Sequence, residues 1–259
     1  MLNCLTFDIE TVPDVDFGRR LYGLEGIDDV HVGAVMFAQR RQLTGSEFLP
    51  FEQQRVVAIS VALRTRDTFR VWSLGEENAG EQEIIERFFR GIEEYTPDLV
   101  SWNGSGFDLP VLHHRALKHG ISAPRFWETG DHDQSFRWNN YVSRFHWRHC
   151  DLMDVLSGFQ GRGRVSLENV ALLLGLPGKL GMRGEEVWGA WQAGRIAAIR
   201  QYCESDVLNT YLIWLRFELL RGRLSPKAHA AECARVRAWL EASGAAHLRE
   251  FLAAWPPAP

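Results

Sequence analysis

Two carboxylates lie two residues apart inside an apolar run at the start of the chain. The stretch CLTFDIETVP, residues 4–13, places Asp8 and Glu10 among residue types that favour β-strands. Side chains two residues apart on a strand point to the same face, so these carboxylates would lie at close range. Because ionised carboxylates repel each other, the pattern requires protons, basic side chains or metal ions beside them.

Two further acids lie where a folded chain could bring them to the same place. Asp108, in SWNGSGFDLPVL, follows an expected strand and a glycine-rich turn and opens an expected helix. Asp206, in IRQYCESDVLNTYLIWL, lies on a long expected helix, on the same face as Tyr202 one turn earlier. Taken singly, each has a structural explanation, Asp108 as a helix cap and Asp206 as a solvated residue beside a buried stripe.

The elements that must position these acids follow from residue type and periodicity. Strands are expected over residues 3–9, 55–64, 68–73 and 99–102, which are rich in β-branched and aromatic residues. Apolar residues at helical spacing predict helices over 80–95, 109–119, 166–174, 186–193 and 195–221, with Ser166 as an N-cap. Strands that come first, with helices interleaved later, predict an α/β fold with a mixed sheet flanked by helices.

Two segments are additions to this pattern. Residues 17–51 separate the first two strands by more than a hairpin needs, and residues 28–42 within them have the pattern of an amphipathic helix. A long insertion beside a site is often a lid or a substrate wall. The tail after Gly222 predicts one or two more helices and ends in a proline-rich stretch.

Bulk properties place the chain among globular proteins. Its 259 residues are 46% hydrophobic and carry a net charge of −4, which suits one domain with extensions. The four cysteines form no CxxC pair, so free thiols in a reducing cytosol are expected. The chain shows no basic leader and no uncharged apolar run of about 18 residues, so we expect a cytoplasmic protein that neither enters a membrane nor is exported.

The order of the acidic motifs resembles that of the DEDD 3'–5' exonucleases of ribonuclease-H-like fold. Within them it is similar to a prokaryotic group related to the exonuclease domain of family B DNA polymerases. The segments RHCDLMDVLSGF, LLGLPGKLGMRGEEVW and YCESDVLNTYLIWLRFELLRG also look like that group, so the resemblance covers most of residues 3–222. It implies a mixed sheet of five to six strands, an exonuclease domain over residues 1–222 and a helical extension over 223–259 packed on it.

The resemblance also implies a cofactor, namely two divalent cations, Mg²⁺ or Mn²⁺. Their ligands would be Asp8, Glu10, Asp108 and Asp206, and such hard cations prefer oxygen ligands. Asp8 would bridge both cations, Glu10 and Asp206 would complete the site of the attacking water, and Asp108 would serve the second cation largely through water. Two cations about 3.5–4 Å apart stabilise the entering and leaving oxygens of a phosphodiester displacement.

The late helix motif assigns the subclass. A related group has a histidine five residues before the last aspartate, but here that position is Gln201, and a tyrosine lies four residues before. The chain therefore resembles the tyrosine version, in which Tyr202 would be a catalytic residue that orients the attacking water. Water activation would rest mainly on the cation.

Substrate contacts are implied at four positions. Thr11, Asn103 and Phe107 occupy places where the family binds the terminal 3' nucleotide, and Lys179 in GLPGKLG would lie near a phosphate. Arg162 and Arg164 in GRGR are further basic candidates, and a solvated loop explains these basic residues as well.

A separate segment, residues 135–150, carries three arginines, several aromatic residues and no acid. Arginines interleaved with aromatic residues suit single-strand binding through phosphate contacts and base stacking. The alternation of Tyr141, Phe145 and Trp147 also fits a strand whose aromatic side chains enter the core. We favour the core interpretation for most of these aromatic side chains.

The function that follows is hydrolysis from the 3' end of single-stranded nucleic acid, DNA favoured over RNA, with release of nucleoside 5'-monophosphates. An RNA-processing exoribonuclease with the same site, or a non-catalytic nucleic-acid-binding module of this fold, are the alternatives. FDIETV also resembles the start of haloacid-dehalogenase-type phosphatases, but Glu10 departs from their pattern and the late YxxxD motif has no place in it. We expect a monomer that acts with a polymerase or repair partner.

Overall fold

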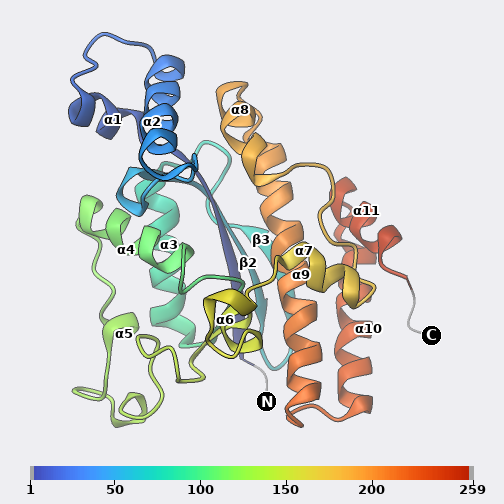
Figure 1. Cartoon of the computed structure of the whole chain (residues 1–259). Helices are drawn as coiled ribbons and strands as arrows, with labels where there is room; N and C mark the ends of the chain where they lie inside the picture. Colours follow the sequence, from blue (N-terminus) through green and yellow to red (C-terminus); the bar gives the residue numbers. More distant parts are fainter. Residues whose placement is uncertain (1–2, 257–259) are drawn as a thin grey trace.

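A computed structural model describes residues 3–256, which form one mixed β-sheet with helices on both faces (Figure 1). The order of strands is β3-β2-β1-β4-β5. β2 runs antiparallel to β1, and β3 runs antiparallel to β2. On the other side of β1, β4 runs parallel to β1 and β5 runs parallel to β4. The strands are β1 (Cys4–Pro13), β2 (Gln54–Arg64), β3 (Phe69–Ser73), β4 (Asp98–Ser101) and β5 (His149–Asp151). This architecture confirms the predicted α/β class and is consistent with a ribonuclease-H-like fold.

Two strands differ from the sequence-based expectation. β1 continues to Pro13 because β2 pairs with it along its whole length, from Cys4↔Arg64 to Pro13↔Gln54. β5 is only three residues long and was not predicted as a strand. So short a segment shows no periodicity, and it becomes a strand only because the edge of β4 is available for parallel pairing.

The helices divide between the two faces of the sheet, with α3 and α4 on one face and α9 on the other (Figure 1). The longer predicted helices are confirmed, with small shifts at their ends, and Ser166 caps α7 as expected. The helices are α1 (Val15–Tyr22), α2 (Asp29–Thr44), α3 (Glu81–Tyr95), α4 (Asp108–His119), α5 (Pro124–Trp127), α6 (Leu152–Leu156), α7 (Leu167–Leu173), α8 (Val187–Gln192), α9 (Ile196–Leu220), α10 (Pro226–Ser243) and α11 (Ala246–Ala254).

The residues between β1 and β2 form two helices, α1 and α2. The helix expected over residues 28–42 is confirmed as α2, whose Val32 and Met36 are buried against Val15. α2 also approaches α8 closely, because a Cβ atom at Gly33 would lie 2.9 Å from the ring of Trp188. The insertion therefore packs on the end of the molecule at which α8 lies (Figure 1).

The last helices, α10 and α11, share the core of α9. Val236, Leu240, Leu248 and Phe251 are buried in the same cluster as the apolar side chains of α9. α9 is apolar nearly all round because the sheet covers one side of it and α10 and α11 cover another. The predicted domain boundary at residue 222 stays a prediction. Between residues 3 and 256, no helix is long and apolar enough to cross a bilayer.

A buried ion-pair network fixes helix α4 against the sheet. The guanidinium of Arg115, on α4, donates to Asp14 at 2.6 Å and to both carboxylate oxygens of Glu81, at 2.7 and 2.5 Å. Glu81 also accepts the backbone N–H of Val56 at 2.7 Å. Because Asp14 follows β1, Val56 lies on β2 and Glu81 opens α3, the network sets where α4 lies relative to all three elements.

Candidate active site

Asp8 and Glu10 lie on the face of β1 that α9 covers. Leu5, Phe7 and Ile9 pack into the core beneath α3 and α4, so the alternation of the strand turns the two carboxylates to the opposite face. Glu10 is buried. The pairing register between β1 and β2 shifts between Glu10 and Thr11, and such bulges re-aim side chains next to functional sites.

Helix α9 brings three side chains to these carboxylates. The thiol of Cys203 lies 3.4 Å from the backbone oxygen of Asp8 and 3.5 Å from its carboxylate, so α9 rests directly on this part of β1. Asp206 is buried one turn from Tyr202, and one of its carboxylate oxygens has no hydrogen-bond partner. The Tyr202 phenol is buried too, and this burial and the charges of Asp206, Glu10 and Asp8 raise its pKa, so it lies near these carboxylates.

Asp108 reaches the same place from the other side of β1. β4 pairs with β1 only from Cys4 to Thr6, so the backbone N–H of Ile9 lies beyond the end of that pairing. The carboxylate of Asp108, the first residue of α4, accepts this N–H at 3.1 Å. Helix capping alone therefore does not explain Asp108, because its carboxylate joins α4 to β1.

The turn before Asp108 is organised by Asp151, which the sequence analysis did not single out. The buried carboxylate of Asp151 accepts the backbone N–H groups of Asn103 and Ser105, both at 2.9 Å. Asn103 adopts a left-handed conformation there, with φ of 64°. Asp151 also caps α6, and an acid directly before a new helix was the sequence signal that could have identified it.

The four carboxylates lie in a poorly solvated, electrically negative place. Burial raises the pKa of Asp108 to about 7 and that of Asp206 to about 6. Burial and the charges of Asp108 and Glu10 raise the pKa of Asp8. Burial and the charge of Asp206 raise the pKa of Glu10. Lys179 partly offsets this at Glu10 and Asp206.

These residues fit hard divalent cations. The buried carboxylates of Glu10, Asp108 and Asp206 and the half-buried one of Asp8 supply oxygen donors, positive charge is scarce among them, and one Asp206 oxygen has no partner. A further possible ligand was missed by the sequence analysis, because Cys203 was treated only as an inert thiol. Its sulfur and one carboxylate oxygen each of Asp8 and Glu10 lie within 4.8 Å of one another. The signal was its place directly after Tyr202 and one helical turn before Asp206.

The raised pKa values predict how the metal-free protein responds to pH. A group whose pKa is higher in the folded than in the unfolded state binds protons more tightly when folded, so its protonation stabilises the fold at low pH. This contribution is lost as pH rises from the ordinary pKa of 3.8 to the folded pKa, which is about 6 for Asp206 and about 7 for Asp108. We therefore expect these two carboxylates to lower the unfolding free energy in EDTA between about pH 4 and about pH 8.

Denaturant titrations at a series of pH values measure this effect. Substitution of all the buried carboxylates is unnecessary, because Asp108→Asn alone should flatten the slope near neutral pH. Added Mn²⁺ should raise stability most at the high end of the series, where the carboxylates are ionised. An Asp108→Asn protein with the same pH dependence as the wild type in EDTA would contradict the account, and this comparison cancels the opposite contributions of His113 and His149, whose pKa values burial lowers to about 4.

The substrate contacts expected from the sequence lie around this cluster. The Lys179 ammonium lies 5.5 Å from the centre of the Tyr202 ring. Thr11 follows Glu10, and its hydroxyl donates to Gln54 at 2.8 Å. The ring of Phe107, next to Asp108, packs on those of Phe48 and Phe51, with ring centres 5.2 and 6.4 Å away. The side-chain oxygen of Asn103 is buried without a partner. Their roles stay predictions.

The arginine-rich segment 135–150 does not form the core strand that the sequence analysis favoured. Tyr141 is buried, but residues 137–148 form turns and bends, and Phe145 and Trp147 are 67% and 40% exposed. Arginine side chains lie over several of these rings, including Arg144 over Phe145. The strand interpretation was therefore wrong, because alternation along the sequence cannot show that a neighbouring strand is available for pairing.

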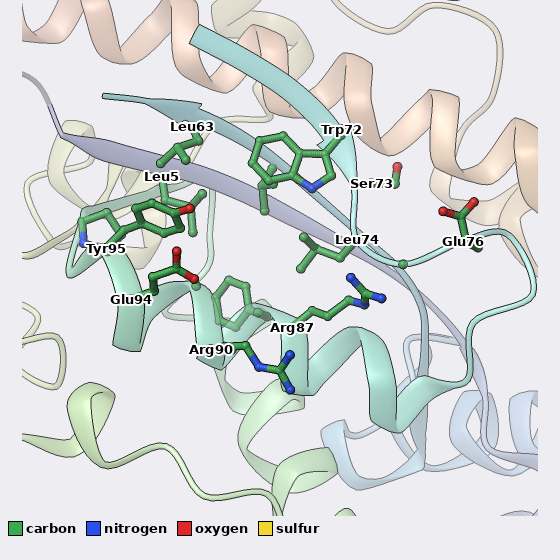
Figure 2. Close-up of a pocket in the computed structure, with 15 residues that line it drawn as sticks. Leu5, Leu63, Trp72, Ser73, Leu74, Glu76, Arg87, Arg90, Glu94 and Tyr95 are labelled. Atoms are coloured by element: carbon green, nitrogen blue, oxygen red, sulfur yellow. The ribbon is translucent and has the colours of Figure 1, made fainter. Parts of the chain in front are cut away.

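A cavity of about 370 Å³ lies elsewhere, between α3 and the sheet (Figure 2). Trp72 and Tyr95 flank it, and Arg87 and Arg90 project from α3 beside it (Figure 2). None of the four carboxylates lines this cavity. It lies on the face of the sheet opposite to α9, so it is separate from the carboxylate cluster.

Comparisons with known proteins agree with the geometry. The chain is 30% identical over 155 residues to a DNA polymerase of Pyrococcus glycovorans, which covers 57% of this chain and 19% of the polymerase. It is 29% identical over 157 residues to a DNA polymerase of Thermococcus kodakarensis, covering 56% of this chain and 9% of the polymerase. A DNA polymerase of Pyrococcus horikoshii is 28% identical over 159 residues, covering 57% and 12% respectively. The chain thus spans a fifth or less of these relatives.

A family described as "Predicted 3'-5' exonuclease related to the exonuclease domain of PolB" matches residues 46–255. The matched residues include Asp108, Tyr202 and Asp206, whereas β1, with Asp8 and Glu10, precedes them. The match extends over well more than half of the 259 residues. The chain therefore belongs to this family of predicted 3'–5' exonucleases related to the exonuclease domain of PolB.

Proposed function

We propose that this protein is a metal-dependent 3'–5' exonuclease that acts on single-stranded nucleic acid, with DNA favoured. It removes nucleotides from the 3' end and releases nucleoside 5'-monophosphates. The observation that carries the proposal is the convergence of Asp8, Glu10, Asp108 and Asp206, from β1, α4 and α9, around one buried, negatively charged place. Membership of the exonuclease family supports it.

In this proposal the four carboxylates hold two divalent cations, Mg²⁺ or Mn²⁺. When bound, the cations polarise the phosphoryl group and lower the pKa of a bound water. Asp8, between Glu10 on its own strand and Asp108 from α4, is placed to serve both. Glu10 and Asp206 would hold the cation that binds the attacking water. The Asp206 oxygen without a hydrogen-bond partner is free to act as a ligand.

Tyr202 orients the attacking water and does not remove its proton. Burial and the charges of Asp206, Glu10 and Asp8 raise the pKa of its phenol, so the hydroxyl stays protonated at neutral pH. The effect of these three charges on its pKa indicates that the hydroxyl lies beside the carboxylates. Lys179, over the Tyr202 ring, contributes the positive charge that faces the phosphate.

The preference for DNA is proposed from the relatives, which are described as DNA polymerases. An exoribonuclease that uses the same carboxylates is the second candidate, because the 2'-hydroxyl is distinguished only by local contacts. We propose a monomer in the cytoplasm, with a polymerase or a repair protein as its partner. The helical extension over residues 223–259 packs on the exonuclease domain in this proposal.

The requirement for a free 3' end tests the polarity of the reaction. A linear single strand with a 3'-hydroxyl should be shortened one nucleotide at a time in Mg²⁺ or Mn²⁺. The same strand with a 3'-phosphate should resist, because the place beside Glu10 and Thr11 must accept a hydroxyl. A circular single strand should stay intact, and its cleavage would show endonuclease action and refute the proposal. DNA and RNA strands of one sequence, run in parallel, separate the two candidate substrates.

A further inference from the structure

A second cavity, of about 330 Å³, lies directly beside helix α4. Leu109, Pro110 and His113 line it from the first turns of α4, and Ser105 lines it from the turn before that helix. These residues flank Asp108 in the chain. Five residues of helix separate Asp108 from His113, which is about 7.5 Å along the helix axis. The cavity therefore begins next to the turn that carries Asp108, and it extends along the first turns of α4.

Aromatic rings form the walls of this cavity. The rings of Phe126 and Tyr141 are stacked, with their centres 5.6 Å apart and their planes 7° apart. The centre of the Trp127 ring lies 4.8 Å from that of His113, and Trp127 is 52% exposed. A half-exposed indole beside a buried aromatic wall offers a flat, apolar face to a ligand. Burial lowers the pKa of His113 to about 4, so its ring adds no charge at neutral pH.

Positive charge gathers on another side of the cavity. Arg144 and Arg164 both line it, and both donate to the buried carboxylate of Asp154, at 2.6 and 3.3 Å. Asp154 offsets one of the two guanidinium charges, and behind the lining the Asp151 carboxylate accepts the backbone N–H groups of Ser105 and Asp154. The two arginine side chains are 45% and 40% exposed, so each keeps N–H donors that face solvent. Asp154 is the one acid among the residues that line this cavity.

We propose that this cavity binds an unpaired nucleobase of the substrate strand, upstream of the nucleotide that is removed. The base stacks on Trp127, and the adjoining phosphate binds Arg144 and Arg164. The inference rests on the proposed function and adds to it the surface that selects a single strand. Aromatic stacking beside arginine is the common means of binding single strands without sequence preference. A paired base would have its faces covered by its neighbours and could not enter.

The location supports this occupant over others. The cavity lies where the parallel strands β4 and β5 end, next to the turn that carries Asp108, and ligands of open α/β sheets bind at that edge. The cavity of Figure 2 offers aromatic rings and arginines too, but Glu76 and Glu94 also line it and none of the four carboxylates does. The cavity at α4 combines aromatic rings and two arginines with a place next to the turn that carries Asp108.

Trp127→Ala tests the stacking contact. Two substrates are compared: a short oligothymidylate, which reaches the cavity, and the p-nitrophenyl ester of thymidine 5'-monophosphate, which offers a single nucleotide. Base–aromatic stacking is lost only with the former, so KM for the oligothymidylate should rise about tenfold more than KM for the ester. The matched control is Trp138→Ala, because Trp138 is 81% exposed and does not line the cavity.

Arg144→Gln tests the phosphate contact independently. It should lower the slope of log affinity against log salt for the oligothymidylate by about 0.7, the contribution of one phosphate contact on a single strand. Arg137→Gln, which removes an arginine that does not line the cavity, should leave the slope as it is. Equal KM ratios for Trp127→Ala and Trp138→Ala would overturn the base site. A wild-type protein that hydrolyses neither substrate would instead refute the proposed function.

Discussion

Asp206→Asn is expected to lower kcat for release of nucleotides by about 10³-fold or more, because an amide cannot replace a carboxylate as a ligand of a divalent cation. Asp206 comes from α9 and is buried, with one oxygen left without a partner. Burial raises its pKa to about 6 although Lys179 and Tyr202 oppose the shift. Burial therefore makes the ionised form of Asp206 unfavourable. A role as a metal ligand would explain why an ionisable group occupies this position.

The same change should leave the fold intact. Asparagine has nearly the shape of aspartate, and it removes a buried charge, so the unfolding free energy in EDTA should stay equal or increase. The measurement is kcat at saturating Mn²⁺, with Asp131→Asn, a change at an exposed loop acid, as the matched control. Turnover within tenfold of the wild-type value would remove Asp206 from the chemistry.

Tyr202→Phe is expected to lower kcat by about 10–100-fold, the low end for positioning and proton-handling groups, because the cation would do most of the water activation. The ring stays in place, so packing in the core and against Lys179 is kept. Only the hydroxyl, which lies near the Asp206 carboxylate, is lost. Metal affinity should therefore change little, and the loss should appear in kcat and not in the metal concentration needed for half-maximal rate.

Tyr211→Phe is the matched control for this change. Tyr211 lies on the same helix, is fully buried, and has a hydroxyl without a hydrogen-bond partner. Its loss removes an unsatisfied polar group and should leave kcat at the wild-type value. If both variants turn over at the wild-type rate, the tyrosine orients nothing, although the metal site would stand.

The parts of the site that could be predicted from sequence are those fixed by local geometry. Asp8 and Glu10 share a face because a strand repeats every two residues, and Tyr202 lies next to Asp206 because a helix brings residues four apart together. Their nearness to each other, across almost two hundred residues, was suggested only by resemblance to a family. The structure adds the contact itself, from the thiol of Cys203 to the carboxylate of Asp8.

The other features of the site depend on where the pairing between β-strands ends and on which residues the fold brings next to one another. Asp108 bonds to Ile9 because β4 leaves that part of β1 unpaired, and no local pattern encodes the end of a pairing. Asp151 organises the turn at Asn103 through backbone N–H groups, which the sequence does not distinguish. Phe145 alternates as a core residue would, yet it is exposed beneath an arginine.

The most direct test of the central claim is identification of what the protein releases from a uniformly labelled, linear single-stranded DNA. In Mg²⁺ or Mn²⁺ we expect nucleoside 5'-monophosphates, released one by one from the 3' end, and no release in EDTA. Asp8→Asn, prepared in the same way, should release almost nothing, which excludes a contaminating nuclease. Absence of release by the wild-type protein, or equal release by Asp8→Asn, would contradict the assignment of this carboxylate cluster as a metal-dependent 3'-exonuclease centre.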